Sequence, residues 1–358
     1  MKKKSLKFYN GGKINMKKYS FVVLFLVFGL ITQSQAQLDG GTSKVGTTSA
    51  QFLKIGAGAR AVGMGGAYSA MSHDIYSVYW NPAGLSTSIN TTEVTFNHAS
   101  WLAEIKYDFA AASLNLGEMG TLAVSFTSLG TPEQEVTTEI NPNGDGRMWD
   151  YGGVAIGLSY SKMLTDRFSV GVNGKYIRER LWNSSASGFA IDVGTLYRTP
   201  FNDLTISAAI FNFGSDMTLD GRDTQFNTDP DDNIDTGPTN IPANYYMDAF
   251  SLPMMFRFGL AMDVVKSRYL RVSAAVDAVQ PNDNSEYLNL GSEFAYDEMF
   301  MVRVGYRQLF MNNSEGGLTF GGGLKYRFAD NYGVAINYAY ANYGRLLEVH
   351  FFDVSIEL

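Results

Sequence analysis

Apolar and polar residues alternate along most of the chain after residue 90. In residues 153–163, GVAIGLSYSKM, large apolar side chains occupy every second position and small or polar ones lie between them. Residues 256–263 and 300–307 repeat this pattern, with arginines among the polar positions. Because successive side chains of a strand point to opposite faces, the alternation predicts strands that are apolar on one face only.

Fourteen strands of this kind are predicted. Their approximate ranges are 91–100, 107–116, 121–129, 152–163, 168–180, 188–198, 203–213, 256–265, 269–279, 286–296, 299–308, 317–328, 332–341 and 349–358. Most of these ranges hold about nine to thirteen residues. A tilted membrane-spanning strand needs about 9–11 residues, whereas a strand of a soluble protein usually has about 5–6.

The connections between these strands alternate in length. Every second connection is a short turn, at residues 117–120, 164–167, 200–203, 265–268, 296–299 and 329–331. The intervening connections are usually longer, above all residues 130–151 and 214–255. Outer-membrane barrels combine short periplasmic turns, longer outer loops and an even number of strands. We therefore predict an all-β fold, a 14-stranded antiparallel transmembrane β-barrel over residues 91–358. A large exported sandwich is the alternative, which strands of this length disfavour.

The first residues resemble an export signal. Lys17 and Lys18 form a basic start, residues 21–31 form an apolar core, and residues 34–36 provide a small-x-small cleavage pattern. The apolar core is shorter than the roughly 20 residues of a spanning helix. We predict a signal peptide over residues 1–36, with Met16 as a candidate start residue. The mature chain then begins at residue 37 and reaches the bacterial outer membrane.

Residues 37–90 contain no predicted strand and are rich in glycine and apolar side chains. Barrels of about eight strands are filled by side chains and those of 16–18 leave an aqueous channel, so fourteen strands need a wet or plugged lumen. We predict that residues 37–90 form a luminal plug. Its central motif, DIYSVYWNPAGLS at residues 74–86, comprises Tyr76, Tyr79, Trp80, Asn81, Pro82, Ala83 and Gly84.

The motif also predicts a local helix start. A following proline disfavours the helical conformation for Asn81, while Pro82 suits the first position of a helix. The Asn81 side chain can then accept a hydrogen bond from a free N–H of the next turn. We expect a hinge or stopper of the plug whose aromatic side chains press against the barrel wall.

Charged residues of both signs occupy the polar face of the predicted strands. The expected luminal network consists of Lys175, Asp192, Arg257, Asp263, Arg271, Asp277, Glu293, Arg303, Arg307, Lys325, Arg327 and Asp353. We interpret this set as cross-lumen ion pairs that stiffen the barrel and hold the plug. A polar conduit is the alternative interpretation.

Composition excludes several other functions. The net charge of −7 opposes nucleic-acid binding, which needs a basic face, and the chain has no cysteine for a disulfide or thiolate metal site. The histidines, His73, His98 and His350, are scattered, and no nucleophile is grouped with a base. Residues 63–68, GMGGAY, lack the third glycine of a nucleotide loop and follow no strand. We expect no enzyme activity and no cofactor.

One acidic loop resembles the beginning of a calcium-binding loop. Asp229, Asp231, Asn233 and Asp235 occupy alternate positions, as calcium ligands do. Ile234 stands at the position of the turn glycine, and Asn240 replaces the bidentate glutamate. A solvated acidic loop is therefore the preferred interpretation, and calcium is a weak alternative.

Residues 52–85, FLKIGAGARAVGMGGAYSAMSHDIYSVYWNPAGL, resemble the N-terminal signature of the PorV/PorQ family of Bacteroidota outer-membrane proteins. The resemblance continues through residues 101–114, 164–182, 187–199 and 212–222. It implies a FadL-like 14-stranded barrel. Some members serve the type IX secretion system, receiving secreted proteins by their C-terminal domain and passing them to an attachment complex. Many others have no assigned role.

The sequence and the resemblance together predict an outer-membrane barrel that supports type IX-type secretion or surface attachment through its outer loops. Its partners are then outer-membrane lipid and secreted proteins or secretion-system components. The alternative is a FadL-like channel for small hydrophobic molecules. A lumen filled by the plug favours protein binding, whereas an apolar luminal pocket beside a kinked wall strand favours transport.

Overall fold

The structure is a computed structural model that describes residues 44–88, 90–229, 240–311, 314–329 and 332–358. The predicted signal peptide and Gln37 lie outside the described residues, as do Asp231, Asn233 and Asp235 of the acidic loop. Among the described residues, no helix is long and apolar enough to cross a membrane.

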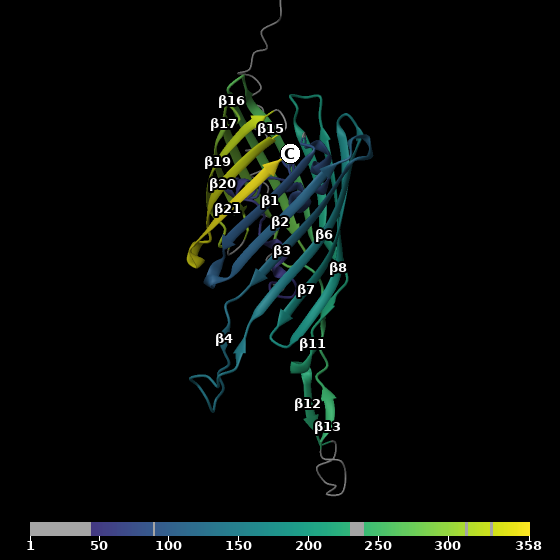
Figure 1. The fold of residues 1–358 in the computed structure, drawn as a ribbon, viewed down its shortest axis with the longest axis vertical. Coiled ribbons are helices and arrows are strands. Elements are labelled where there is room, and N and C mark those ends of the chain that lie inside the picture. Colours follow the sequence, from purple (N-terminus) through teal and green to yellow (C-terminus); the bar gives the residue numbers. More distant parts are fainter. Residues whose placement is uncertain (1–43, 89, 230–239, 312–313, 330–331) are drawn as a thin grey trace, which may run out of the picture. The chain divides into compact units, whose positions relative to one another are not determined.

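Fourteen long antiparallel strands close into a barrel (Figure 1). They are β1 Thr92–Ser100, β2 Lys106–Asn115, β3 Thr121–Gly130, β6 Tyr151–Thr165, β7 Phe168–Leu181, β8 Ser184–Arg198, β9 Thr205–Gly214, β15 Met255–Lys266, β16 Leu270–Pro281, β17 Tyr287–Tyr296, β18 Phe300–Leu309, β19 Leu318–Ala329, β20 Tyr332–Asn342 and β21 Glu348–Glu357. Closure comes from the pairing of β1 with β21 and of β8 with β9. The predicted fold is confirmed.

The alternation of the sequence becomes an alternation between the two faces of the wall. On β18, Val302 is 63% exposed on the outer face, while the adjacent Arg303 is 1% exposed on the luminal face. On β6, Ile156 and Leu158 point outward, and Ala155 and Ser159 are buried. An outward band of apolar side chains is what a lipid-facing barrel requires.

The two ends of the barrel differ. The turn end holds the short connections β2–β3, β6–β7, β8–β9, β15–β16, β17–β18 and β19–β20, together with the start of β1 and the end of β21. The opposite loop end carries short strands that the sequence did not predict. They are β4 Gln134–Glu135, β5 Met148–Trp149, β10 Met217–Thr218, β11 Asp220–Gly221, β12 Gln225–Thr228, β13 Ile241–Asn244 and β14 Ala249–Phe250. β4 pairs with β5, β12 with β13 and β10 with β14, and β11 adds to wall strand β8. In Figure 1, β4, β12 and β13 project beyond the barrel, away from the carboxyl terminus.

The N-terminal segment packs inside the barrel through short helices, as predicted. These are η1 Gln51–Lys54, α2 Ala59–Gly63, α3 Ser77–Trp80 and η2 Pro82–Thr87. Four further single turns, η3 Leu102–Glu104, η4 Gly117–Met119, η5 Arg222–Thr224 and η6 Gly344–Leu346, lie in connections between strands. The segment begins near the loop end, where the Ala50 N–H donates to Glu179 of β7 at 2.9 Å. It leaves at the turn end, where β1 begins.

Candidate functional site in the plugged lumen and at the loop end

The Asn81-Pro82 step starts helix η2. Asn81 has an extended backbone, with φ −171° and ψ 104°, and its side-chain oxygen accepts a hydrogen bond from the Ala83 N–H at 3.1 Å. Pro82 is the first residue of the helix. Because proline has no N–H to satisfy and its φ is already helical, it fits this position without loss. The predicted capping arrangement is therefore confirmed.

Two wall glycines make room for this helix start. A Cβ atom added to Gly194 on β8 would lie 2.0 Å from the Asn81 side-chain oxygen, and one added to Gly171 on β7 would lie 2.3 Å from the Pro82 carbonyl carbon. The Asn81 amide group donates to the Thr195 carbonyl of β8 at 3.1 Å. The motif is thus in direct contact with the backbones of two neighbouring strands, β7 and β8.

The three aromatic side chains of the motif anchor different parts of the plug. Tyr76 stacks on Phe109 of β2, with ring centroids 5.8 Å apart, and its hydroxyl lies 2.6 Å from the Thr95 hydroxyl of β1. The Thr95 hydroxyl also donates to the Val354 carbonyl of β21 at 3.1 Å. One side chain on β1 therefore touches the plug and the last strand of the barrel.

Trp80 and Tyr79 bind the earlier part of the plug. The Trp80 indole donates to the Ala57 carbonyl at 2.7 Å, and the Tyr79 hydroxyl donates to the Leu53 carbonyl at 3.0 Å. The Arg257 guanidinium of β15 lies 4.6 Å from the centre of the Trp80 ring. A cation above an aromatic face is stabilised by the ring quadrupole, most strongly where water is excluded.

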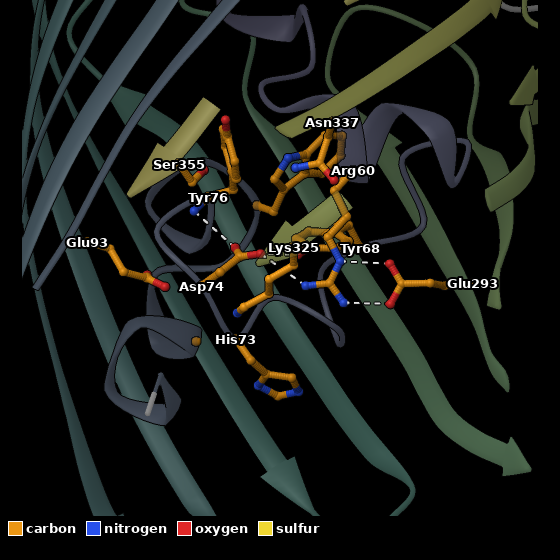
Figure 2. A network of polar contacts seen from close by, with 12 residues as sticks. Arg60, Tyr68, His73, Asp74, Tyr76, Glu93, Glu293, Lys325, Asn337 and Ser355 are labelled. Atoms are coloured by element: carbon orange, nitrogen blue, oxygen red, sulfur yellow. Dashed lines mark hydrogen bonds and ion pairs between the residues drawn. The ribbon is translucent and has the colours of Figure 1, made fainter. Parts of the chain in front are cut away.

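Glu293 on β17 pairs with three luminal arginines, and Figure 2 shows its contacts with one of them, Arg60. Its fully buried carboxylate contacts Arg60 of helix α2 at 2.8 Å, Arg303 of β18 at 2.7 Å and Arg271 of β16 at 2.9 Å. Arg60 also contacts Asp74 of the plug at 3.2 Å. A buried carboxylate needs such pairing, because an isolated charge is very costly away from water.

A second chain of contacts links Arg303 back to the plug. Arg303 donates to Asn337 at 2.8 Å, Asn337 donates to Asp353 at 2.7 Å, and Asp353 accepts from the Ala59 N–H at 2.6 Å. Helix α2 is therefore held at its first residue and at Arg60 by two connected branches of one network. Both branches end on the barrel wall, so displacement of α2 would leave buried polar groups without partners.

The other predicted charges lie in smaller groups. Lys175 pairs with Asp192 at 2.8 Å, and Asp277 accepts from the Ser69 N–H at 3.0 Å. At or near the turn end, Lys325 and Arg327 contact Glu357, and Asp263 accepts from Ser273 at 2.6 Å. Arg307 lies 4.7 Å from the centre of the Tyr343 ring. The twelve residues thus form several clusters rather than one continuous network.

The contributors to these clusters that were missed include Arg60, Asp74, Asn337 and Glu357. Arg60 is the only arginine in residues 37–90, and an arginine in a glycine-rich apolar stretch was a usable signal. Glu357 shares a strand face with Asp353 under the period of two, so the alternation already placed it toward the lumen. Neither its partner nor that of Arg60 can be read without the strand register.

A small cavity of about 30 Å³ separates the plug from the wall. Leu53, Val78 and Tyr79 line it from the plug, and Lys175 and Arg257 line it from the wall. The Arg257 Nε and Nη1 atoms have no hydrogen-bond partner among the described residues. A cavity of this size holds about one water molecule, and water is a suitable acceptor for such donors.

His73 is a half-buried histidine of the plug. Its Nδ1 atom lies 2.8 Å from the Thr87 hydroxyl of helix η2. Burial, with the nearby cations of Arg198 and Arg60, lowers the pKa of His73 to about 4. The imidazole is therefore neutral at physiological pH.

Comparison with known proteins identifies the family of this chain. The family model described as "Type IX secretion system protein PorV" matches residues 39–241, more than half of the chain. The chain belongs to the PorV family. This match contains the plug motif and the first seven barrel strands. No curated protein sequence matches this PorV-family chain.

Solved structures share the fold. The Pseudomonas putida toluene transporter TodX is 12% identical, with a TM-score of 0.53, and the match covers 84% of this chain and 96% of TodX. The Ralstonia pickettii toluene transporter TbuX is 14% identical, with a TM-score of 0.52 and coverage of 84% and 97%. A Pseudomonas aeruginosa FadL homologue is 12% identical, with a TM-score of 0.50 and coverage of 84% and 97%. This PorV-family protein is a FadL-like outer-membrane β-barrel.

The described residues group few other side chains in the way that catalytic or metal sites do. The PorV family of outer-membrane barrels is non-enzymatic. Within the described ranges, no three histidine, cysteine or acidic side chains group as metal ligands would. The structure gives His98 a contact with Asp108 at 2.7 Å and His350 a contact with Tyr338 at 2.8 Å, and it does not bring the histidines together.

Proposed function

We propose that this chain supports type IX-type protein secretion or surface attachment by binding partner proteins at its loop end. In this proposal the loop end faces the cell exterior and the turn end faces the periplasm, as the loop lengths of outer-membrane barrels require. The observation that carries the proposal is the combination of a filled lumen with exposed structured loops.

The plug supports the binding of partner proteins rather than the passage of small molecules through the lumen. The cavity of about 30 Å³ beside the plug is far smaller than the roughly 300–1,000 Å³ of ligand pockets. A route through the lumen would require helix α2 to leave Glu293 and Asp353, which it contacts at 2.8 and 2.6 Å. Leaving one buried charge of such a pair without its partner costs about 3–5 kcal/mol.

The loop end supports a protein partner. The hairpin of β12 and β13 and the residues after it expose large side chains, with Tyr246 at 93% and Tyr245 at 60% exposure. The hairpin of β4 and β5 carries Ile140 at 89% exposure. Aromatic side chains on protruding, hydrogen-bonded elements are typical of protein-binding surfaces.

The alternative is a FadL-like channel for small hydrophobic molecules. One observation favours it: β9 carries a bulge opposite Asp192, where Phe211 and Asn212 face a single residue of β8 and Asn212 has φ +59°. This irregular wall strand lies beside the small cavity, which Phe211 and Asn212 also line. Two structures of similar fold are titled toluene transporters, although a likeness at 12–14% identity concerns the fold alone.

Deletion of the gene for this chain separates the two functions when surface proteomics and uptake of a hydrophobic probe such as toluene are measured together. We expect surface-attached proteins to be lost and toluene uptake to be unchanged. Unchanged surface proteins with lost uptake would contradict the proposed function and support the channel.

A further inference from the structure

A groove of about 320 Å³ opens at the loop end between three elements. Its apolar walls come from Trp149 of β5, from Leu181 and Trp182 at the β7–β8 turn, and from Leu219, Tyr245 and Met247 of the connection between β9 and β15. The groove is therefore separate from the plugged lumen and about ten times larger than the cavity beside the plug.

The walls of the groove are tied together by hydrogen bonds. The Trp182 N–H donates to the Asp150 carbonyl at 2.9 Å, and the Asn183 N–H donates to the Asp223 carboxylate at 2.9 Å. On the opposite side, the Tyr245 N–H donates to the Thr224 carbonyl at 2.9 Å. A preformed groove binds more tightly than one that must be ordered, because less conformational entropy is lost.

The size and lining of the groove suit a large apolar side chain. Its volume lies near the lower limit of the roughly 300–1,000 Å³ of ligand pockets, which is enough for one aromatic side chain with its neighbouring backbone. Two tryptophans, a tyrosine and a methionine are the residue types enriched where proteins bind one another. Aromatic anchors buried in such pockets supply most of the binding energy of an interface.

The segments around the groove carry more acidic than basic side chains, and Arg147, which lies 5.5 Å from the centre of the Trp182 ring, is paired with Asp145. The described residues of 215–254 include five aspartates and one arginine, and residues 131–150 contain five acidic residues and one arginine. Asp223 lines the groove, while Asp220 and Asp248 directly follow the lining residues Leu219 and Met247. Within the part of the chain that the structure describes, these three aspartates have no ion-pair partner.

We propose that this groove binds a segment of a partner protein that presents one aromatic or large aliphatic side chain flanked by lysine or arginine. The apolar anchor fills the groove, and the flanking cations face the aspartates on its rim. Charge complementarity of this kind favours the correct partner and speeds its encounter. The inference rests on the proposed function, because it names the partner chemistry for the loop end.

The first test uses fluorescent pentapeptides and the full mature chain purified in detergent. The probes are Lys-Lys-Phe-Lys-Lys, the same peptide with a central alanine, and Glu-Glu-Phe-Glu-Glu, with binding followed by anisotropy. We expect the first peptide to bind at least about tenfold more tightly than either of the others. Equal binding of the two phenylalanine peptides would overturn the charge requirement and indicate a groove for neutral hydrophobic molecules.

Matched variants locate the binding. Leu219→Gln with Met247→Gln makes the groove polar, and we expect it to weaken binding of the lysine peptide by about tenfold. Asp220→Asn with Asp248→Asn should weaken binding and reduce its salt dependence, since flanking charges are screened by salt. Met119→Gln changes an exposed apolar residue at the turn end, at 65% exposure, and should leave peptide binding unchanged. Binding that survives the double glutamine variant would overturn the inference.

An experiment in cells distinguishes failure of this inference from failure of the proposed function. The Leu219→Gln and Met247→Gln variant is expressed in the deletion strain, with barrel assembly checked by heat-modifiable migration in gels. We expect loss of surface-attached proteins, as in the deletion strain, with a normal amount of folded barrel. Normal surface attachment by this variant, in a strain whose deletion abolishes attachment, would overturn the groove and leave the proposed function standing.

Discussion

Arg60 of the plug and Glu293 of the wall meet through two parallel contacts, Nε to Oε2 at 2.9 Å and Nη2 to Oε1 at 2.8 Å. This fork-to-fork geometry fixes the orientation of helix α2 as well as its position, because a guanidinium and a carboxylate are both planar. Figure 2 shows the Arg60 side chain extended between Glu293 and Asp74. The pair is a direct side-chain connection between the plug and the barrel wall.

Replacement of Arg60 should loosen the plug while the barrel stays closed. Glu293 keeps Arg303 and Arg271, at 2.7 and 2.9 Å, so we expect Arg60→Met to lower the free energy of plug opening by about 2–3 kcal/mol, less than the loss of a whole buried pair. Hydrogen exchange at the amides of residues 59–66 measures this opening. The exposed pair Arg345–Glu315 provides the control, since Arg345 is 87% exposed and Arg345→Met should cost less than about 1 kcal/mol. Equal exchange in the two variants would contradict the role of Arg60.

Glycine at position 171 should be required, and glycine at position 174 should not. Both residues lie on β7, but a Cβ on Gly171 would lie 2.3 Å from the Pro82 carbonyl carbon, whereas one on Gly174 meets nothing within 4 Å. We expect Gly171→Ala to displace helix η2 at a cost of about 1–3 kcal/mol, as overpacking does. Faster proteolysis between residues 81 and 88 reports the displacement. Gly174→Ala should show the cleavage rate of the unaltered chain.

The amide of Asn81 should be needed as a donor as well as a cap. Its oxygen caps Ala83 at 3.1 Å, while its NH₂ group donates to the Ser69 and Thr195 carbonyls at 3.2 and 3.1 Å. Asn81→Ala loses all three hydrogen bonds, and we expect a loss of about 2–3 kcal/mol in plug stability. Asn81→Asp keeps the cap but places a carboxylate against two carbonyl oxygens. Rescue of the same exchange-measured stability by aspartate would show that only the cap matters.

Acid should weaken the plug through His73. Its pKa is lowered to about 4 in the folded protein, against about 6.5 for an unperturbed histidine, so between these values the unfolded state binds more protons. The contribution of the neutral imidazole is therefore fully present above pH 6.5 and is lost as the pH falls toward 4. The urea midpoint of plug release, followed by fluorescence in a variant that keeps only Trp80, should fall from pH 7 to pH 5. His73→Gln should reduce that fall, and an unchanged pH dependence would exclude His73 as its source.

The strands were predictable because the wall is governed by one simple rule. Lipid outside and polar groups inside impose a period of two, so β15 was expected at 256–265 and spans Met255–Lys266. The largest difference is at β8, which begins at Ser184 rather than at 188. Residues 184–187 are Ser-Ser-Ala-Ser, which show no alternation of apolar and polar side chains. They still pair with β7, because the antiparallel pairing of β7 with β8 continues to the end of β7.

The contacts of the plug and the shape of the loop end were less predictable. Arg60 meets Glu293 across 233 positions of sequence, and only the register of fourteen strands brings these two residues together. The groove at the loop end depends on short pairings such as β12 with β13, in a region whose composition resembles an ordinary polar loop. Sequence pattern identified the plug motif, but not the partners that hold it.

Thr95 joins the plug and the first strand of the barrel to the last strand, which is made much later. Its hydroxyl contacts Tyr76 of the plug at 2.6 Å and lies 2.8 Å from the Ser355 hydroxyl of β21, which is 260 positions later in the chain. A growing chain therefore cannot complete this junction until its final ten-residue strand has been synthesised and delivered. The β1–β21 pairing that closes the barrel and the contacts of Thr95 with the plug and with β21 are therefore completed in the same late step. A chain truncated before β21 would lose both.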